Sequence, residues 1–153
     1  MADLPQVEAA DGVEAIETLA GKFQLKVRSG EHTLFADEPA SVGGLGTGLS
    51  PYELVSAGLA ACTVMTMRLY ANRKGFPLER ASTTVQHEKV PDMMPPDRFT
   101  RTIVLDGPLS DDQRARILAI ADRCPVDLSL IRGSDVQTEL LSTSQAADPA
   151  RLA

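Results

Sequence analysis

Residues 50–75 read SPYELVSAGLAACTVMTMRLYANRKG, and this stretch decides the fold. It opens with helix-start signals, because Ser50 is a good N-cap, a proline suits the first helical position, and Glu53 completes a Ser-x-x-Glu capping box. Gly75 supplies the stop. Since no charge lies between Glu53 and Arg68, the pattern predicts a long helix that is apolar on every face and therefore buried all round.

We expect this helix to stay out of a membrane. Glu53 and Arg68 leave about fourteen residues between charges, whereas a membrane span needs roughly twenty apolar residues. The N-terminus shows neither the basic and apolar regions of a secretory signal nor an arginine-rich transit peptide. These features predict a cytoplasmic protein.

Composition narrows the class of protein further. A length of 153 residues suits one domain, and four Phe, two Tyr and no Trp predict an aliphatic, alanine-rich core. The formal net charge of -6 argues against a nucleic-acid partner, because phosphate binding needs clustered Lys and Arg. His32 and His87 are isolated in sequence, so we expect no metal site and no cofactor.

The chain before the long helix combines three patterns. Residues 1–21 are acidic and are expected to be either a short helix or disordered. Alternating apolar and charged residues over 22–36, interrupted by Ser29-Gly30, predict a β-hairpin. The glycine-rich residues 43–48 are interpreted as a flexible connector rather than a dinucleotide fingerprint, because they lack GxGxxG spacing.

The chain after the helix predicts a second antiparallel pair of strands, over residues 80–88 and 98–106. Ser110 then caps a second helix that ends near Cys124. Residues 135–141 are expected to form a last strand. Taken together, these elements predict an α+β fold with antiparallel sheets packed around the long buried helix and the second helix.

Two cysteines, Cys62 at the centre of the long helix and Cys124 before a proline, suggest reduced thiols or a redox pair in a cytoplasmic protein. Cysteine is also among the most buried residue types, so inert core packing is the alternative for both. The cysteines alone leave these alternatives open.

Three motifs resemble the OsmC/Ohr family of thiol-dependent peroxidases, in its broader OsmC-like branch. They are Ser50-Pro-Tyr-Glu-Leu with Ala60-Ala-Cys62-Thr, Arg68-x-Tyr-Ala-x-Arg-Lys-Gly75, and Asp122-Arg-Cys124-Pro-Val. The resemblance covers roughly residues 22–141, which we expect to form the OsmC-like domain, with a polar tail over 142–153. It implies an intertwined homodimer with the cysteine helices at its centre and active sites at the subunit interface.

The resemblance also implies a chemistry. Cys62 corresponds to the thiol that attacks a hydroperoxide and becomes a sulfenic acid, and Cys124 to the resolving thiol that closes a disulfide. An external dithiol then reduces that disulfide. Four methionines are expected to pack or to line an apolar entrance rather than bind a cofactor, namely Met65, Met67, Met93 and Met94. An entrance of this kind would favour organic hydroperoxides over hydrogen peroxide.

A buried thiol is inert unless a cation stabilises its thiolate. Arg28 in the first hairpin is the preferred candidate for this thiolate stabiliser, ahead of Arg68 and Arg123. The family carries a glutamate directly after the helix-opening proline to orient that arginine, whereas this chain has Tyr52 there and Glu53 one place later. Glu53 is therefore a candidate arginine-orienting carboxylate as well as a capping residue.

Two other functions stay open from the sequence. A non-catalytic OsmC-like protein would use the interface pocket to bind an apolar or thiol-bearing small molecule. A redox sensor would signal through the same disulfide, although the sequence contains nothing that resembles a DNA-reading element. The reactivity of the Cys62 thiolate discriminates between the enzyme and the binding protein.

Overall fold

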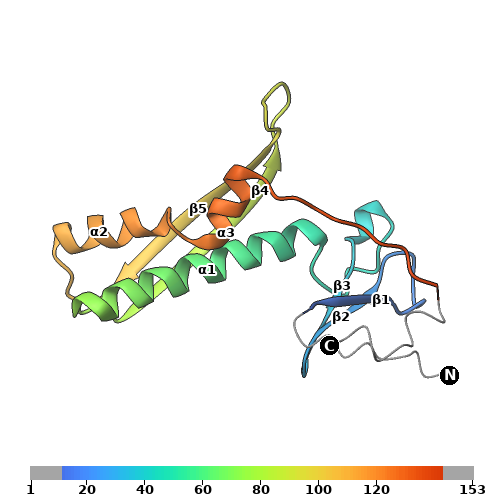
Figure 1. Cartoon of the computed structure of the whole chain (residues 1–153), viewed down its shortest axis with the longest axis horizontal. Helices are drawn as coiled ribbons and strands as arrows, with labels where there is room; N and C mark the ends of the chain where they lie inside the picture. Colours follow the sequence, from blue (N-terminus) through green and yellow to red (C-terminus); the bar gives the residue numbers. More distant parts are fainter. Residues whose placement is uncertain (1–11, 143–153) are drawn as a thin grey trace. The chain divides into compact units, whose positions relative to one another are not determined.

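A computed structural model of the chain describes residues 12–142 and has the α+β architecture that the sequence predicts (Figure 1). The elements are β1 (Glu14–Glu17), β2 (Leu25–Ser29), β3 (His32–Ala36), the 3-10 helix η1 (Ala40–Val42), α1 (Pro51–Lys74), β4 (Arg80–Lys89), β5 (Asp97–Asp106), α2 (Asp111–Ala121) and α3 (Pro125–Arg132). The described residues divide into two compact units, one of residues 12–51 with 136–142 and one of residues 52–135. The domain boundaries expected at residues 21 and 141 stay predictions.

The first unit contains an antiparallel sheet in the order β1-β2-β3. The predicted hairpin is confirmed, because β2 pairs with β3 from Leu25 opposite Ala36 to Ser29 opposite His32. The helix expected near the N-terminus is wrong for residues 14–17, which form β1 and pair with β2. Their side chains alternate between half-buried and exposed, as a strand with one covered face requires. Residues 1–11 of the acidic segment lie outside the described part.

The glycine-rich loop is organised around one buried carboxylate, that of Asp37, and its flexibility as a connector stays a prediction. Asp37 Oδ2 accepts hydrogen bonds from the backbone N–H groups of Leu45 and Thr47, at 3.1 and 3.2 Å, and from the Thr47 hydroxyl at 2.8 Å. Gly44 is required by close packing, because a Cβ there would lie 1.8 Å from the carbonyl oxygen of Glu38. Backbone and side-chain contacts thus stabilise the conformation of this loop.

The second unit is built on α1, which begins and ends where the sequence predicts. Pro51 is its first residue, Glu53 lies in its first turn, and Gly75 ends it with a φ of 65°. That left-handed conformation favours glycine, because a Cβ would be strained there. The local signals at both ends thus locate α1 without help from tertiary contacts.

Within one chain α1 is covered on one face only, so its burial all round stays a prediction for the expected homodimer. Its buried residues form one stripe, spaced three or four residues apart: Ser56, Leu59, Thr63, Met67 and Ala71. A second stripe contains large apolar side chains that are exposed, namely Val55, Met65 and Leu69, with Met65 69% exposed. The elements of one chain thus cover only one face of an apolar helix.

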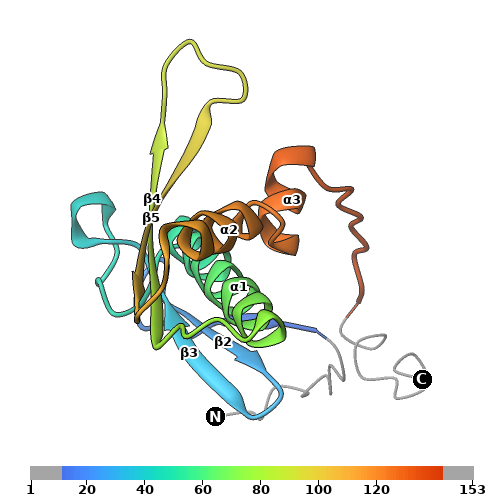
Figure 2. The ribbon, with the colours of Figure 1, turned by 90° about the vertical axis from the view of Figure 1, so that its left-hand side faces the viewer.

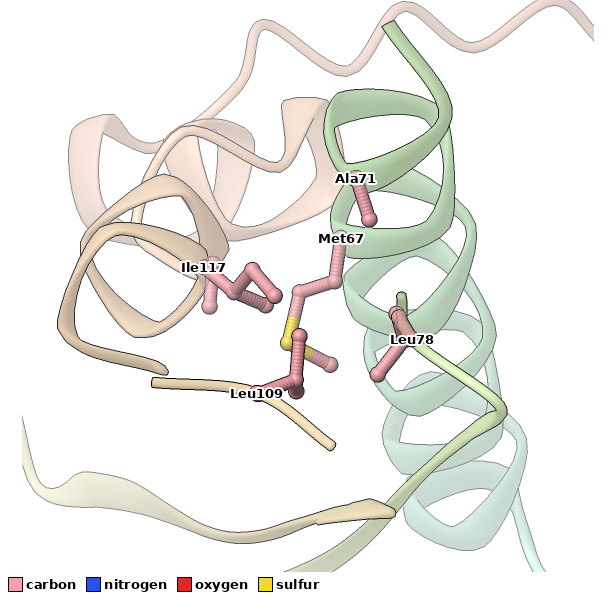
Figure 3. Packing of buried hydrophobic residues seen from close by; sticks show 6 residues of the cluster. Met67, Ala71, Leu78, Leu109 and Ile117 are labelled. Atoms are coloured by element: carbon pink, nitrogen blue, oxygen red, sulfur yellow. The ribbon is translucent and has the colours of Figure 1, made fainter. Parts of the chain in front are cut away.

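The buried stripe of α1 faces the core of the second unit. Strands β4 and β5 form a long antiparallel hairpin, as predicted, and α1 and α2 lie side by side over one of its faces (Figures 1 and 2). Met67 points from α1 toward Ile117 of α2 and toward Leu109 (Figure 3). Leu78 and Ala71 complete the centre of this aliphatic core.

The end of the chain differs from the prediction in two ways. Helix α2 has the predicted cap, since Ser110 and Gln113 exchange hydrogen bonds in a capping box, but a further helix, α3, follows from Pro125. The strand expected over 135–141 is wrong, because residues 133–142 form no regular element. A strand needs a neighbour to pair with, and no described strand pairs with this segment. Residues 143–153 of the expected tail lie outside the described part.

Helix α1 alone, among the described residues, is long and apolar enough to cross a membrane. The expectation that Glu53 and Arg68 exclude a span is therefore not supported by the length of the whole helix. Core helices of soluble proteins meet the same criterion, and the buried stripe packed on α2 identifies such a role for one face of α1.

Candidate active site

The two cysteines lie together in the second unit. Cys62 is half-buried in the middle of α1, and Cys124 is fully buried at the N-cap of α3. Both are free thiols, and a hydrogen bond joins the side chains of Cys62 and Cys124. The fold thus brings together the two residues that the resemblance pairs, although their chemical roles stay predictions.

The start of α3 determines the surroundings of Cys124. Pro125 occupies the first helical position, where its missing N–H costs nothing. The next two backbone N–H groups, of Val126 and Asp127, lower the pKa of Cys124, although the Cys124 side chain makes no capping hydrogen bond. A thiol at a helix N-cap is therefore surrounded by donors that favour its thiolate.

Burial nevertheless dominates at Cys124. Burial raises the pKa of Cys124 above its ordinary value, the hydrogen bond with Cys62 raises it further, and the N–H groups of Asp127 and Val126 lower it only in part. The thiol of Cys124 is consequently protonated at neutral pH. Cys62 is the more accessible of the two sulfurs, since Cys124 has no exposed surface.

An arginine that the sequence reasoning missed connects the two cysteine-bearing segments. Arg101 on β5 donates from Nη1 to the hydroxyl of Thr63, at 3.3 Å, and to the carbonyl oxygen of Ala121, at 3.0 Å. Its Nη2 donates to Asp122 Oδ1 at 2.8 Å and lies 3.4 Å from Asp127 Oδ1. Asp122 and Asp127 flank Cys124, and Thr63 follows Cys62.

A signal for Arg101 was present in the alternation of β5. Phe99, Arg101, Ile103 and Leu105 share one face of the strand, and all four are half-buried. An arginine in phase with apolar residues on a covered face needs acidic or carbonyl partners. Those partners come from distant segments, so the sequence alone does not identify them.

The predicted thiolate stabiliser and its carboxylate stay predictions. Arg28 lies on β2 in the first unit and forms an ion pair with Glu14 at 3.2 Å, whereas Cys62 lies in the second unit. Glu53 is exposed in the first turn of α1. Both Arg28 and Glu53 have further interactions, so neither is free of partners.

The two alternative arginines have other surroundings. Arg68 donates to the carbonyl oxygens of Leu78 and Glu79, at 2.6 and 3.0 Å, and so fixes the connection between α1 and β4. Arg123 is exposed in the turn before Cys124. Since Arg68 is occupied by the carbonyls after α1, its contacts support a structural role.

Tyr52, which stands at the family's glutamate position, belongs to a small aromatic cluster. Its ring stacks on His87 with centroids 3.9 Å apart and planes inclined by 3°. His87 Nε2 lies 2.8 Å from Asp97 Oδ1 on the neighbouring strand β5. The described residues contain no group of three His, Cys, Asp or Glu side chains placed to hold a metal ion.

Comparison with known families decides the classification. The family model for OsmC-like proteins matches residues 44–139, which include both cysteines and more than half of the chain. The chain belongs to the OsmC-like protein family. The resemblance in the three motifs is thereby confirmed, and no curated protein shows significant similarity to the chain.

Solved structures of OsmC-like proteins share the fold. An OsmC-like protein from Mycoplasma pneumoniae is 19% identical, with a TM-score of 0.65 over 78% of this chain and 86% of its own. An organic hydroperoxide resistance protein from Legionella pneumophila is 24% identical, with a TM-score of 0.58 over 77% and 86%. A third, from Vibrio cholerae, is 20% identical with a TM-score of 0.58 over 78% and 83%, and its structure has captopril bound in one active site.

Proposed function

We propose that this OsmC-like protein reduces organic hydroperoxides with Cys62 and Cys124. The observation that carries the proposal is the hydrogen bond between a half-buried and a fully buried thiol held on two different helices. The family includes members described as organic hydroperoxide resistance proteins, and the described chain offers no cluster of metal ligands for another redox chemistry. The difference in accessibility favours Cys62 as the attacking thiol and Cys124 as the resolving thiol.

The proposed reaction has three steps. The Cys62 thiolate attacks the hydroperoxide, an S–O bond forms, the O–O bond breaks, and the leaving alkoxide takes up a proton as an alcohol. Cys124 then attacks the sulfenic sulfur, the S–S bond forms, and the released hydroxide combines with the Cys124 proton to give water. An external dithiol reduces the disulfide and is itself oxidised to a disulfide. Thiolate stabilisation by Arg28, oriented by Glu53, belongs to the first step of this proposal.

The proposal includes a cytoplasmic homodimer. The exposed stripe of α1 contains Val55, Met65 and Leu69, and Gly58 lies on the same face with nothing within 4 Å of the position of a Cβ. A glycine inside a helix costs about 1 kcal/mol relative to alanine, so the chain gains nothing from Gly58 by itself. Close approach of a second α1 would explain both the glycine and the uncovered apolar side chains.

A non-catalytic binding protein is the alternative, and Tyr52 favours it. Tyr52 replaces the family glutamate and is stacked on His87, so an aromatic cluster fills the start of α1. In that case Cys62 would react with hydroperoxide no faster than an ordinary thiol. A small apolar or thiol-bearing ligand would bind at the interface, as captopril does in an active site of the relative from Vibrio cholerae.

Intact mass measured after brief exposure to a stoichiometric organic hydroperoxide tests the enzyme, with hydrogen peroxide run in parallel. We expect rapid loss of two hydrogens per chain, which reports the disulfide. Cys62→Ser should abolish hydroperoxide consumption, whereas Cys124→Ser should allow one oxidation and block turnover with a dithiol. Survival of both thiols in the wild type would overturn the peroxidase and leave the binding protein.

A further inference from the structure

The guanidinium of Arg101 contacts every segment that positions the two thiols. It binds the turn of α1 that carries Cys62 through the Thr63 hydroxyl, and the end of α2 through the carbonyl of Ala121. It binds the segment around Cys124 through Asp122 and Asp127. The Arg101 side chain is only 16% exposed, so these contacts occur largely away from water.

On the Cys62 side, Thr63 is oriented to accept from Arg101. The hydroxyl of Thr63 is fully buried and donates its hydrogen to the carbonyl oxygen of Leu59 at 2.7 Å. Its lone pairs are therefore left for the Arg101 Nη1 donor. These two hydrogen bonds connect Arg101 through the side chain of Thr63, which follows Cys62, to the backbone carbonyl of Leu59 in α1.

On the Cys124 side, Asp127 depends on Arg101. Asp127 is 7% exposed, and its Oδ2 is buried without a hydrogen-bond partner among residues 12–142. Arg101 is the cation paired with the other oxygen, Oδ1. Asp127 lies in the first turn of α3, and Cys124 is the N-cap of the same helix, so a displacement of Asp127 also displaces Cys124.

We propose that Arg101 is a positioning residue that holds the segments of Cys62 and Cys124 at the separation required for disulfide formation. The proposal rests on the proposed function, since the disulfide is the product of the resolving step. Disulfide geometry is narrow, with Cα atoms about 4.4–6.8 Å apart, and a shift of one segment reduces the rate of closure steeply. Arg101 exchanges no electrons or protons and acts only on where the sulfurs lie.

The test measures the effective concentration of the two thiols in glutathione redox buffers, by intact mass, for the folded full-length protein. Arg101→Gln removes the charge and most of the donors, and we expect the effective concentration to fall about tenfold or more. Arg114→Gln is the matched control, because Arg114 is likewise half-buried and donates to the backbone carbonyls of Leu105 and Gly107, but to neither cysteine segment. We expect the Arg114→Gln value to stay within about twofold of the wild type.

A second measurement separates positioning from general destabilisation. The urea midpoints of the reduced and disulfide forms are compared in each variant, since a purely structural residue destabilises both forms equally. Positioning requires that Arg101→Gln destabilise the disulfide form more than the reduced form. Equal losses, or an effective concentration like that of Arg114→Gln, would overturn the proposal.

Two milder variants keep the test decisive if Arg101→Gln does not fold. Thr63→Val and Asp127→Asn each remove one contact of Arg101. We expect each variant to lower the effective concentration of the two thiols about threefold or more. Wild-type values in both variants would overturn the proposal. The redox-buffer assay uses no hydroperoxide. A wild type that forms the disulfide in glutathione but leaves hydroperoxide unconsumed would therefore overturn the proposed peroxidase and retain the role of Arg101.

Discussion

Two buried carboxylates, Asp37 in the first unit and Asp127 in the second, are held in different ways. Asp37 accepts from the backbone N–H groups of Glu38, Leu45 and Thr47 and from the Thr47 hydroxyl, so both of its oxygens are bonded. Asp127 has one oxygen in an ion pair with Arg101 and one without a hydrogen-bond partner among the described residues. Their burial is similar, at 2% and 7% exposed.

The difference indicates different tasks. A fully bonded carboxylate surrounded by backbone donors stabilises a local loop and needs no distant partner. A half-bonded carboxylate depends on one arginine from another element and so couples that element to its own helix. Asp37 therefore stabilises the conformation of its own loop, whereas Asp127 connects β5 to the segment of Cys124.

The largest expected effect comes from breaking the ion pair of Asp127. Arg101→Ala leaves the carboxylate without its cation, which costs about 3–5 kcal/mol for a buried pair. The double variant Arg101→Met with Asp127→Leu should recover most of that loss, because apolar replacement of a buried pair is often neutral or stabilising. Urea unfolding of the reduced forms measures both changes. A single variant as stable as the wild type would contradict the buried pair.

The resolving step should depend on pH because of the surroundings of Cys124. Burial raises the pKa of Cys124 above its ordinary value, so only a small fraction is thiolate at neutral pH. Between pH 7 and 8.5 the rate constant for disulfide formation should rise nearly tenfold per pH unit, in proportion to that fraction. Stopped-flow measurement after one equivalent of hydroperoxide gives this rate, and Cys124→Ser isolates the first oxidation. A flat profile would show that deprotonation of Cys124 does not limit the step.

Most of the fold could be predicted because its signals are local. The caps at Ser110 and Gly75 and the alternation in residues 98–106 depend on neighbours within a few residues, and the structure confirms the helices and strands they predict. Pro125 was an equally local signal for α3, and the apolar residues after it were not interpreted as a helix.

The errors concern contacts between distant residues. The absence of charge along the middle of α1 does not say which face its own chain covers, so the sequence did not identify the exposed stripe that contains Met65. Arg101 and Asp127 are 26 positions apart, and no periodicity links them. The pairing of Cys62 with Cys124 came from family resemblance, because spacing in sequence does not determine which thiols meet.

The carboxylate of Asp37 should make the stability of its loop sensitive to acid. Burial raises the pKa of Asp37, but hydrogen bonds from Thr47, Glu38 and Leu45 outweigh it and the net pKa lies below 3.8. The folded pKa is below the unfolded one, so the contribution is complete above about pH 4 and is lost as pH falls through the folded value. Hydrogen exchange at the Leu45 and Thr47 amides, measured by NMR, should therefore become less protected as the pH falls below about 4. Asp37→Asn should remove the pH dependence, whereas Glu38→Gln should preserve it.

The smallest expected effect is the change in stability when alanine replaces a glycine on α1, compared with the same replacement in the loop after Asp37. At Gly48 in the loop after Asp37, a Cβ would lie 2.2 Å from the carbonyl oxygen of Phe35, whereas at Gly58 on α1 it would meet nothing within 4 Å. Gly48→Ala should therefore destabilise the chain, and Gly58→Ala should stabilise α1 in an isolated chain by up to about 1 kcal/mol. If a second α1 packs on the exposed stripe, the added methyl group instead weakens the dimer. Sedimentation equilibrium of Gly58→Ala measures the effect on dimerisation. An unchanged dimerisation constant, combined with higher stability, would show that no helix approaches Gly58 closely.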